Sequence, residues 1–461
     1  MTPLRTLALT LALATVGLHT ASAQSLIEVY DAARAYDAAF QSAQAAYDAA
    51  ESRAQQLRAG LLPQVGLQLG VSRAPTDVRV RGLPSTDYNV VSQTAGISAT
   101  QPLYRPANAI SYTQGQRQVE VYRAALDAAA QDLLVRTSQA YFDVLGAQDT
   151  LAFVRAQKAA VAEQLASAKR NFDVGTATIT DAREAQARYD LVAAQEIATE
   201  NDLQVKRLAL DQLAGRAGIV PQPLTATGTL ADLQPQALER WVEQAQTSQP
   251  SVRQARLALE VAQLDVKKAE AAHLPTVDLQ AGYSAARYPN GTTTVPAHFS
   301  ANGGSIGVQL NMPIFAGYSI QNRVRETLSL EDKARADLDT ALRNVAQSTR
   351  ALFFGAVSSA GQVKALETAE ASSQSALEAN QLGYQVGVRI NIDVLNAQSQ
   401  LYQTKRDLAQ ARYNLLLTSL RLRQAAGTLA PQDLYNINAL LASAPCPSAE
   451  QKPSDTACAP R

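Results

Sequence analysis

The chain has 461 residues, and its 41 lysines and arginines are balanced by 41 aspartates and glutamates. This balance excludes a bulk polycation that would attract nucleic acid. After residue 23 the histidines are His273 and His298 and the cysteines are Cys446 and Cys458, an inventory too sparse for a metal cluster or a His-dependent triad. We therefore expect no enzyme activity, no metal and no cofactor.

Residues 1–23 are typical of a secretory signal peptide. They contain the basic Arg5, a short apolar core from Leu7 to Leu18, and small residues at Ala21-Ser22-Ala23, which predicts cleavage before Gln24. Because Gln24 is not a cysteine, we expect no lipid anchor. No later segment reaches the roughly 20 apolar residues that a spanning helix needs. If the mature chain enters a membrane, it must do so as strands.

The mature chain repeats itself. "LLPQVGLQLGVS", ending at Ser72, recurs as "HLPTVDLQAGYS", ending at Ser284, and "VGTATITDAREAQ" recurs as "VGVRINIDVLNAQ", both at an offset of 212 residues. A constant offset over more than a hundred residues indicates a tandem duplication. We expect a first repeat over 24–215, a linker over 216–237, a second repeat over 238–427 and a C-terminal segment over 428–461.

Each repeat predicts the same order of elements. In the first, a helix over about 26–60 precedes two strands within about 62–104, a long helix over about 107–172 and a helix over about 179–214. In the second, the corresponding elements are a helix over about 238–272, two strands within about 274–315, a long helix over about 319–384 and a helix over about 391–426. The strand assignment depends on strict alternation, in which Val65, Leu67, Leu69 and Val71 share one face.

The four predicted strands, of about ten residues each, are long enough to cross a bilayer when tilted. A soluble sandwich would show the same alternation, but four strands alone would leave two exposed edges. Three chains in cyclic symmetry would instead supply twelve strands and close the sheet.

The two long helices contain no proline, and each would extend roughly 100 Å. The helix over about 391–426 carries a heptad seam of large residues, with small residues between them: Val394, Leu401, Leu408, Leu415 and Leu422. This seam fits a solitary two-helix coiled coil or the wall of a tube made of several such helices.

The C-terminal tail leaves two readings open. Export would permit a disulfide between Cys446 and Cys458. The Pro- and Ser-rich composition equally fits a disordered tail with free thiols.

The duplication, the strand starts and above all "GYQVGVRINIDVLNAQSQLYQTKRDLAQARYNLL" resemble the TolC family of outer-membrane efflux and secretion proteins over about 24–430. The resemblance implies an α+β membrane protein of the Gram-negative outer membrane. It would be a homotrimer with a 12-stranded β-barrel, four strands per chain, continuous with a long periplasmic α-helical barrel. The linker and the segment after Gly427 would form an equatorial domain.

The resemblance also implies a passive exit duct in a tripartite efflux or type I secretion system. Its partners would be a periplasmic adaptor protein, an inner-membrane transporter of the ABC or RND type, and outer-membrane lipid. The rival readings are a strand-anchored structural or adhesive coiled-coil protein without a continuous pore, and an enzyme with scattered carboxylates.

By the same resemblance, Gly175 and Gly387 would form helix turns at the periplasmic tip of the helical barrel. Threefold symmetry would gather Asp393 into a cation-selective ring at the narrowest point. Secretion-type members commonly carry a second aspartate one turn later, and this chain has Asn396 there. The ring should therefore carry half the charge and block more weakly.

A gate of polar links is also implied. Tyr384 and Arg389 on one coil would bond to Gln164, Thr180 and Asp181 on the other, with Arg389 to Asp181 or Thr180 as the leading pair. Gln381 replaces an expected acidic residue, which predicts a weaker resting constriction. The alternative for Asp181 and Arg389 is a solvated charge at a helix end.

Overall fold

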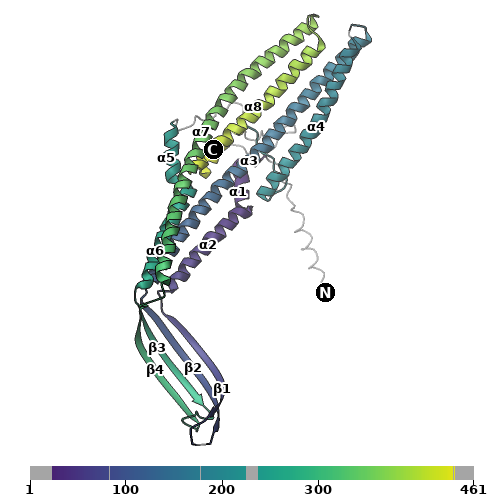
Figure 1. Ribbon diagram of the computed structural model, residues 1–461. Helices are drawn as coiled ribbons and strands as arrows, with labels where there is room; N and C mark the ends of the chain where they lie inside the picture. Colours follow the sequence, from purple (N-terminus) through teal and green to yellow (C-terminus); the bar gives the residue numbers. More distant parts are fainter. Residues whose placement is uncertain (1–22, 83, 177, 225–236, 440, 442–461) are drawn as a thin grey trace, which may run out of the picture. The chain divides into compact units, whose positions relative to one another are not determined.

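The computed structural model describes residues 23–82, 84–176, 178–224, 237–439 and 441 (Figure 1). The chain divides into two compact units. The helical unit comprises Met1–Gln41, Ala128–Gln249 and Val345–Arg461, and the sheet unit comprises Ser42–Asp127 and Pro250–Asn344. The body of the predicted signal peptide, and the tail with Cys446 and Cys458, lie outside the described residues.

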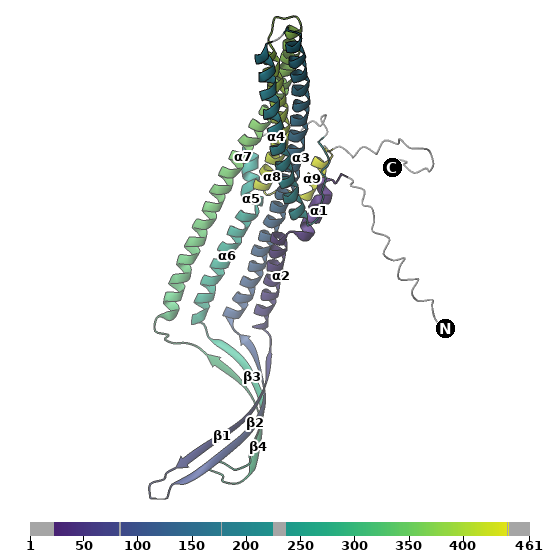
Figure 2. The same ribbon diagram turned by 90° about the vertical axis from the view of Figure 1, so that its right-hand side faces the viewer.

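The sheet unit is built on one four-stranded antiparallel sheet in the order β1-β2-β3-β4 (Figure 2). The strands are β1 Gln64–Val78, β2 Thr86–Tyr104, β3 Thr276–Tyr288 and β4 Phe299–Asn311. Each repeat supplies one hairpin, and β2 pairs with β3 so that Ile97 lies opposite Tyr283. The strands have 13 to 19 residues, longer than the ten expected, because the pairing continues toward the hairpin loops.

The sheet has two chemically different faces. The apolar face carries large side chains that are 64–78% exposed: Val65, Leu67, Leu69, Val71, Ile306, Val308 and Leu310. The polar face carries the residues that alternate with them. Apolar side chains in this number and at this exposure require a covering partner in the working protein.

Helices α2 Ala38–Ala59 and α6 Pro250–Glu270, with the short helix η1 Ala271–His273, belong largely or wholly to the sheet unit, together with the first parts of α3 and α7. A Cβ added to Gly115 of α3 would lie 2.7 Å from Leu57 Cδ1, so the glycine permits close approach to α2. Ion pairs join α3 to α6, with Arg117 Nε 3.1 Å from Glu260 Oε2 and Arg253 Nη1 3.3 Å from Asp127 Oδ2.

The helical unit contains the remaining helices and the larger parts of the two long ones. They are α1 Leu26–Tyr36, α3 Pro106–Asp173, α4 Ile179–Ala214, α5 Leu238–Ser248, α7 Ser319–Gln385, α8 Asn391–Ala425 and α9 Pro431–Asn438. Its main core is mostly aliphatic and includes the rings of Phe142 and Tyr413, which are stacked with their centroids 5.7 Å apart. Buried leucines of α1, α4, α8 and α9 complete this core: Leu26, Leu210, Leu420 and Leu434.

Two helices that were predicted as continuous are broken. The helix expected over 26–60 divides at Asp37, which ends α1 and whose Oδ1 accepts a hydrogen bond from the Phe40 amide at 2.8 Å at the start of α2. The helix expected over 238–272 divides at Gln249, which precedes Pro250 and has extended backbone angles. A residue before proline is disfavoured in the helical region, while proline suits the first turn of the next helix.

The heptad seam of α8 is buried, which confirms its prediction. Val394 and Leu401 pack with Leu377 of α7, and Leu408 and Leu415 pack with Val363 of the same helix. The α7–α8 pair is thus held by a narrow row of large residues with smaller ones between them.

Candidate functional site

Two helix turns in the helical unit carry the predicted tip residues. Gly175 lies in the turn after α3 with φ 79° and Gly387 in the turn after α7 with φ 80°, both in the left-handed region that favours glycine. After each glycine the chain bonds back to the helix, through Thr176 N to Asn171 O at 2.8 Å and Val388 N to Gly383 O at 2.9 Å. This closure satisfies the last helical carbonyls and reverses the chain into α4 and α8.

The two turns differ at the start of the second helix. At α4, the Asp181 amide donates to Thr178 Oγ1 at 3.2 Å, while the Thr178 amide and hydroxyl donate to Asp181 Oδ2 at 3.0 and 2.8 Å. This capping box occupies the Asp181 carboxylate within its own helix. At α8 the equivalent of Thr178 is Ile390, whose side chain has no hydrogen-bonding atom. Asp393 therefore forms no capping box.

Asp393 instead faces Arg389. Arg389 Nη1 lies 3.7 Å from Asp393 Oδ2, and the side chains are 59% and 34% exposed. An exposed pair at this distance contributes roughly 0–1 kcal/mol. The Asp393 carboxylate therefore remains available to another cation.

Polar contacts near the turns connect the α3–α4 hairpin to the α7–α8 hairpin. The Gln164 amide donates to Asn391 Oδ1, Asn171 Nδ2 donates to Tyr384 OH at 3.3 Å, and Arg188 Nη2 donates to Asn396 Oδ1 at 2.9 Å. The Asn391 side chain is 1% exposed, and among the described residues no partner reaches its Nδ2. Within the described part of the chain, the NH2 group of the buried Asn391 side chain has no acceptor, so the bond that its oxygen accepts from Gln164 is the one hydrogen bond of this side chain. Losing that bond would leave the whole side-chain amide buried without a partner, which is costly.

A small apolar cluster lies beneath these contacts. It contains Val161, Leu165 and Ala168 of α3, Ala185 of α4 and Leu395 of α8, with Tyr189 and Ile392 packed at its margin. Close to the turns, the two hairpins are thus joined by a few polar bonds and one small apolar contact.

The structure places the predicted gate residues near the turns with partners of their own. Gln164 bonds to Asn391, Tyr384 to Asn171, Arg389 to Asp393, and Asp181 to Thr178, while Thr180 is exposed. The link from Arg389 to Asp181 or Thr180 remains a prediction, as do the gate and ring roles.

Sequence reasoning missed Asn171, Arg188 and Asn391. Asn391 aligns in the duplication with Ile179. The change from an apolar to a polar residue at this helix start was the sequence signal that could have identified Asn391. Asn396 was noted only for the charge it lacks, whereas the structure bonds it to Arg188.

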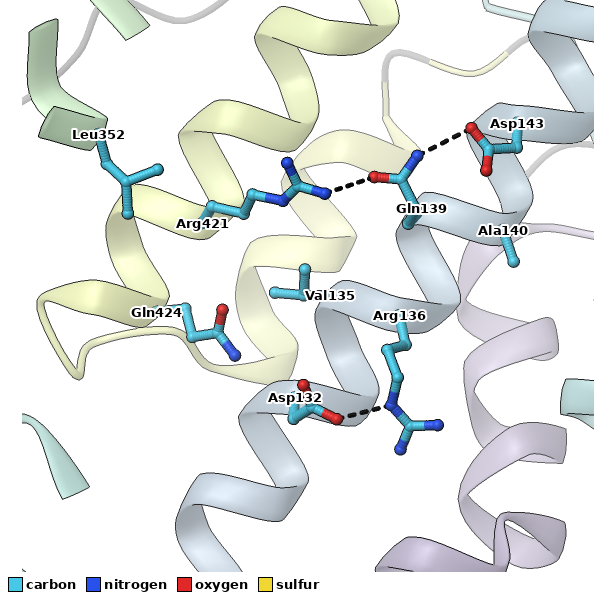
Figure 3. A pocket seen from close by; sticks show the side chains of 9 residues that line it. All are labelled: Asp132, Val135, Arg136, Gln139, Ala140, Asp143, Leu352, Arg421 and Gln424. Atoms are coloured by element: carbon cyan, nitrogen blue, oxygen red, sulfur yellow. Dashed lines mark hydrogen bonds and ion pairs between the residues drawn. The ribbon is translucent and has the colours of Figure 1, made fainter. Parts of the chain in front are cut away.

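A separate hollow of the helical unit is lined by α3, α7 and α8 (Figure 3). Arg421 Nη2 donates to Gln139 Oε1 at 2.8 Å, and Gln139 Nε2 donates to Asp143 Oδ1 at 2.8 Å. Arg136 bonds to Asp132 Oδ2 at 2.6 Å and to both carboxylate oxygens of Asp37. The charged groups and Gln139 in this hollow bond to one another or to Asp37, so the hollow fits a structural network.

The described residues contain neither a cluster of potential metal ligands nor a helix that could span a membrane. No group of three or more histidine, cysteine, aspartate or glutamate side chains there is arranged to hold a metal ion. Within the same part of the chain, no helix combines the length and apolar character of a membrane span.

Comparison with known proteins identifies the family. The model of the family described as "Outer membrane efflux protein" matches residues 29–216 and 241–428, one match in each repeat. The outer membrane protein TolC of Vibrio cholerae is 34% identical over 417 residues, which cover 90% of this chain and 94% of the relative. The alkaline protease secretion protein AprF of Pseudomonas aeruginosa is 30% identical and covers 95% of this chain and 92% of its own length.

Solved structures share the fold at lower sequence identity. CusC, described with transmembrane channel formation, has a TM-score of 0.77 at 18% identity and covers 88% of this chain and 92% of its own. The outer membrane protein VceC of Vibrio cholerae has a TM-score of 0.75 at 18% identity and covers 87% and 96%. With both repeats matched by the family model and the relatives aligned over most of their length, the chain belongs to the outer membrane efflux protein family, the TolC family that its sequence resembles.

Proposed function

We propose that the chain is the passive outer-membrane exit duct of a tripartite efflux or type I secretion system. It would receive cargo from an inner-membrane transporter of the ABC or RND type through a periplasmic adaptor protein. The protease secretion role in the name of AprF favours polypeptide cargo, and the efflux family favours small compounds. The duct would need no cofactor and no nucleic acid.

The observation that carries this proposal is the pair of open edges on an amphipathic sheet. Among the described residues, strands β1 and β4 each have a neighbour on one side only, and the apolar face is exposed. Open edges pair readily with another strand. In a homotrimer, β4 of one subunit would pair with β1 of the next, giving a closed twelve-stranded barrel with its apolar face toward outer-membrane lipid.

The helical unit would supply the periplasmic tube and its gate. Three copies of the α3–α4 and α7–α8 hairpins would form its wall, with Gly175 and Gly387 at the tip. Asp393 would form the cation-binding ring, and Gln164, Thr180, Asp181, Tyr384 and Arg389 would supply links that hold the tip closed. The Asp393 carboxylate has only a weak, partly exposed pair with Arg389, which supports its role in the ring.

Single-channel recording in a planar bilayer tests the proposal. The purified full chain should insert as a complex of three subunits and give stepwise conductance with a resting, largely closed level. A complex that binds lipid and adaptor but conducts no ions would favour the strand-anchored coiled-coil protein without a pore.

A further inference from the structure

The polar face of the sheet carries almost no charge. The strand register sets four complete rows across it, each made of glycine, serine, threonine, glutamine or alanine. The rows are Gln64–Thr100–Gln280–Gly307, Gly66–Ser98–Gly282–Ser305, Gln68–Gly96–Ser284–Gly303 and Gly70–Thr94–Ala286–Ala301. Among the described residues of the four strands, Asp278 is the single side chain on this face that is charged at neutral pH.

Asp278 is neutralised by a residue from the end of another strand. Arg105, directly after β2, approaches with Nε 2.7 Å from Oδ1 and Nη2 2.5 Å from Oδ2 of Asp278. The Asp278 side chain is 9% exposed and the Arg105 side chain 40%. This bidentate contact fixes the guanidinium against the carboxylate, and the two opposite charges offset each other at short range.

We infer that Arg105 and Asp278 together keep the sheet section of the duct uncharged, so that this section passes cargo without sorting it by charge. The inference rests on the proposed function, in which the polar face surrounds an aqueous passage. Rings of charged side chains make a pore selective for ions of opposite sign. Under threefold symmetry, one unpaired charge per subunit would form such a ring, and the Arg105–Asp278 pair prevents it.

The glycines of the polar face show that the passage has room for charge. A Cβ added to Gly303 or Gly307 would meet no atom within 4 Å. Within one chain no atom excludes a side chain from these two positions, so close packing does not explain why they are uncharged. A cargo chain of either net charge, such as an extended polypeptide, would meet only uncharged groups along these rows.

The test measures the cation-to-anion permeability ratio of the full-length channel from its reversal potential in a salt gradient. Ionic strength is kept near 0.01 M, because the Debye length is then about 30 Å and a wall charge is felt across a wide passage. Arg105→Gln leaves Asp278 unpaired and should raise the ratio by roughly twofold or more. Asp278→Asn leaves Arg105 unpaired and should lower it, and the double variant should return it to the wild-type value.

Arg253→Gln is the matched control, because it breaks a single arginine–aspartate pair between helices. It should leave the permeability ratio unchanged. Gly307→Glu and Gly307→Lys calibrate the assay and should move the ratio in opposite directions. All variants are also measured with Asp393→Asn, which removes the proposed ring at the α7–α8 turn.

The outcomes separate this inference from the proposal on which it rests. If the Gly307 variants shift the permeability ratio and the Arg105 and Asp278 single variants do not, the pair has only a structural role and the inference is wrong. If the channel conducts but the Gly307 variants have no effect, the polar face does not line the passage. If no preparation conducts, the duct itself is rejected, and the inference with it.

Discussion

Arg389 and Asp393 face each other across the first turn of α8, with the guanidinium Nη1 3.7 Å from the carboxylate Oδ2. The Arg389 side chain is largely exposed and the Asp393 side chain is 34% exposed, so the pair is weak and easily exchanged for another partner. In the first repeat the aspartate at the same place, Asp181, is occupied by Thr178. The duplication has thus produced one bound and one available carboxylate.

Replacing Asp393 should weaken cation block. We expect Asp393→Ala to relieve block of the channel by multivalent cations applied from the periplasmic side, because three carboxylates at a constriction bind such ions cooperatively. Block is measured as the concentration that halves single-channel current. Asp407→Ala, on an exposed part of α8, should leave it unchanged. Block that persists in Asp393→Ala would place the cation site elsewhere.

Replacing Arg389 should affect both the gate and the ring. Arg389→Ala should raise resting conductance if this arginine holds the tip closed. It should also tighten block by multivalent cations, because Asp393 loses its neutralising neighbour. Both quantities come from the same bilayer recordings. An unchanged resting conductance would count against a gate role for Arg389, even if cation block changes.

Removing the partner of Asn391 should loosen the contact between hairpins. In Gln164→Ala the buried Asn391 amide loses its bond, which should cost about 1–2 kcal/mol of local stability. Hydrogen exchange of the first-turn amides of α8 would report the cost. Gln186→Ala, whose bonds are exposed, should change it by less than about 0.5 kcal/mol.

Asn391→Ile, which restores the residue type of the first repeat, provides a second check. It removes the buried polar group altogether, so adding Gln164→Ala to it should cost little. If Gln164→Ala costs as much in the presence of Asn391→Ile as alone, the Gln164–Asn391 bond is not the source of the loss.

Gly387, in the turn after α7, and Gly361, within α7, should respond in opposite ways to alanine. Gly387→Ala forces a side chain into the left-handed region and should destabilise the turn by about 1 kcal/mol. Gly361 is helical with open space around its Cα, so Gly361→Ala should stabilise α7 by about 0.5–1 kcal/mol. Thermal unfolding of the purified protein gives the comparison. A neutral Gly387→Ala would mean that the turn adopts another conformation.

Asp37, at the break between α1 and α2, should make the stability of the protein depend on pH. The hydrogen bond from Arg136, more than any other contact, holds the pKa of Asp37 below its ordinary value of 3.8. The folded state therefore binds fewer protons than the unfolded state in this range, so the stabilisation is complete above pH 3.8 and is lost as pH falls through the depressed pKa.

Asp37→Asn should remove this component. We expect the variant to be about 1 kcal/mol less stable than the wild type at neutral pH, and the difference to shrink as the pH falls below 4. Unfolding midpoints between pH 2 and 7 give the comparison. Asp48→Asn, on the exposed face of α2, should follow the wild-type curve. A constant difference at all pH values would show that the loss comes from the helix cap.

The local patterns of the sequence were sufficient for much of the fold. The heptad seam from Val394 to Leu422 predicted which side of α8 is buried, because a helix face is set by spacing alone. The alternation from Val65 to Val71 predicted an amphipathic strand for the same reason. The breaks at Asp37 and Gln249 were missed, because helical periodicity continues across a short interruption.

The sequence by itself determined the duplication, the order of the elements and the chemistry of each helix and strand face, since these depend on neighbours within a few residues. Only the tertiary structure decided which polar groups meet. Arg105 pairs with Asp278 because β2 lies beside β3, and Gln164 meets Asn391 because two hairpins pack together. Such partners lie far apart along the chain, and local spacing carries no information about where packing brings them.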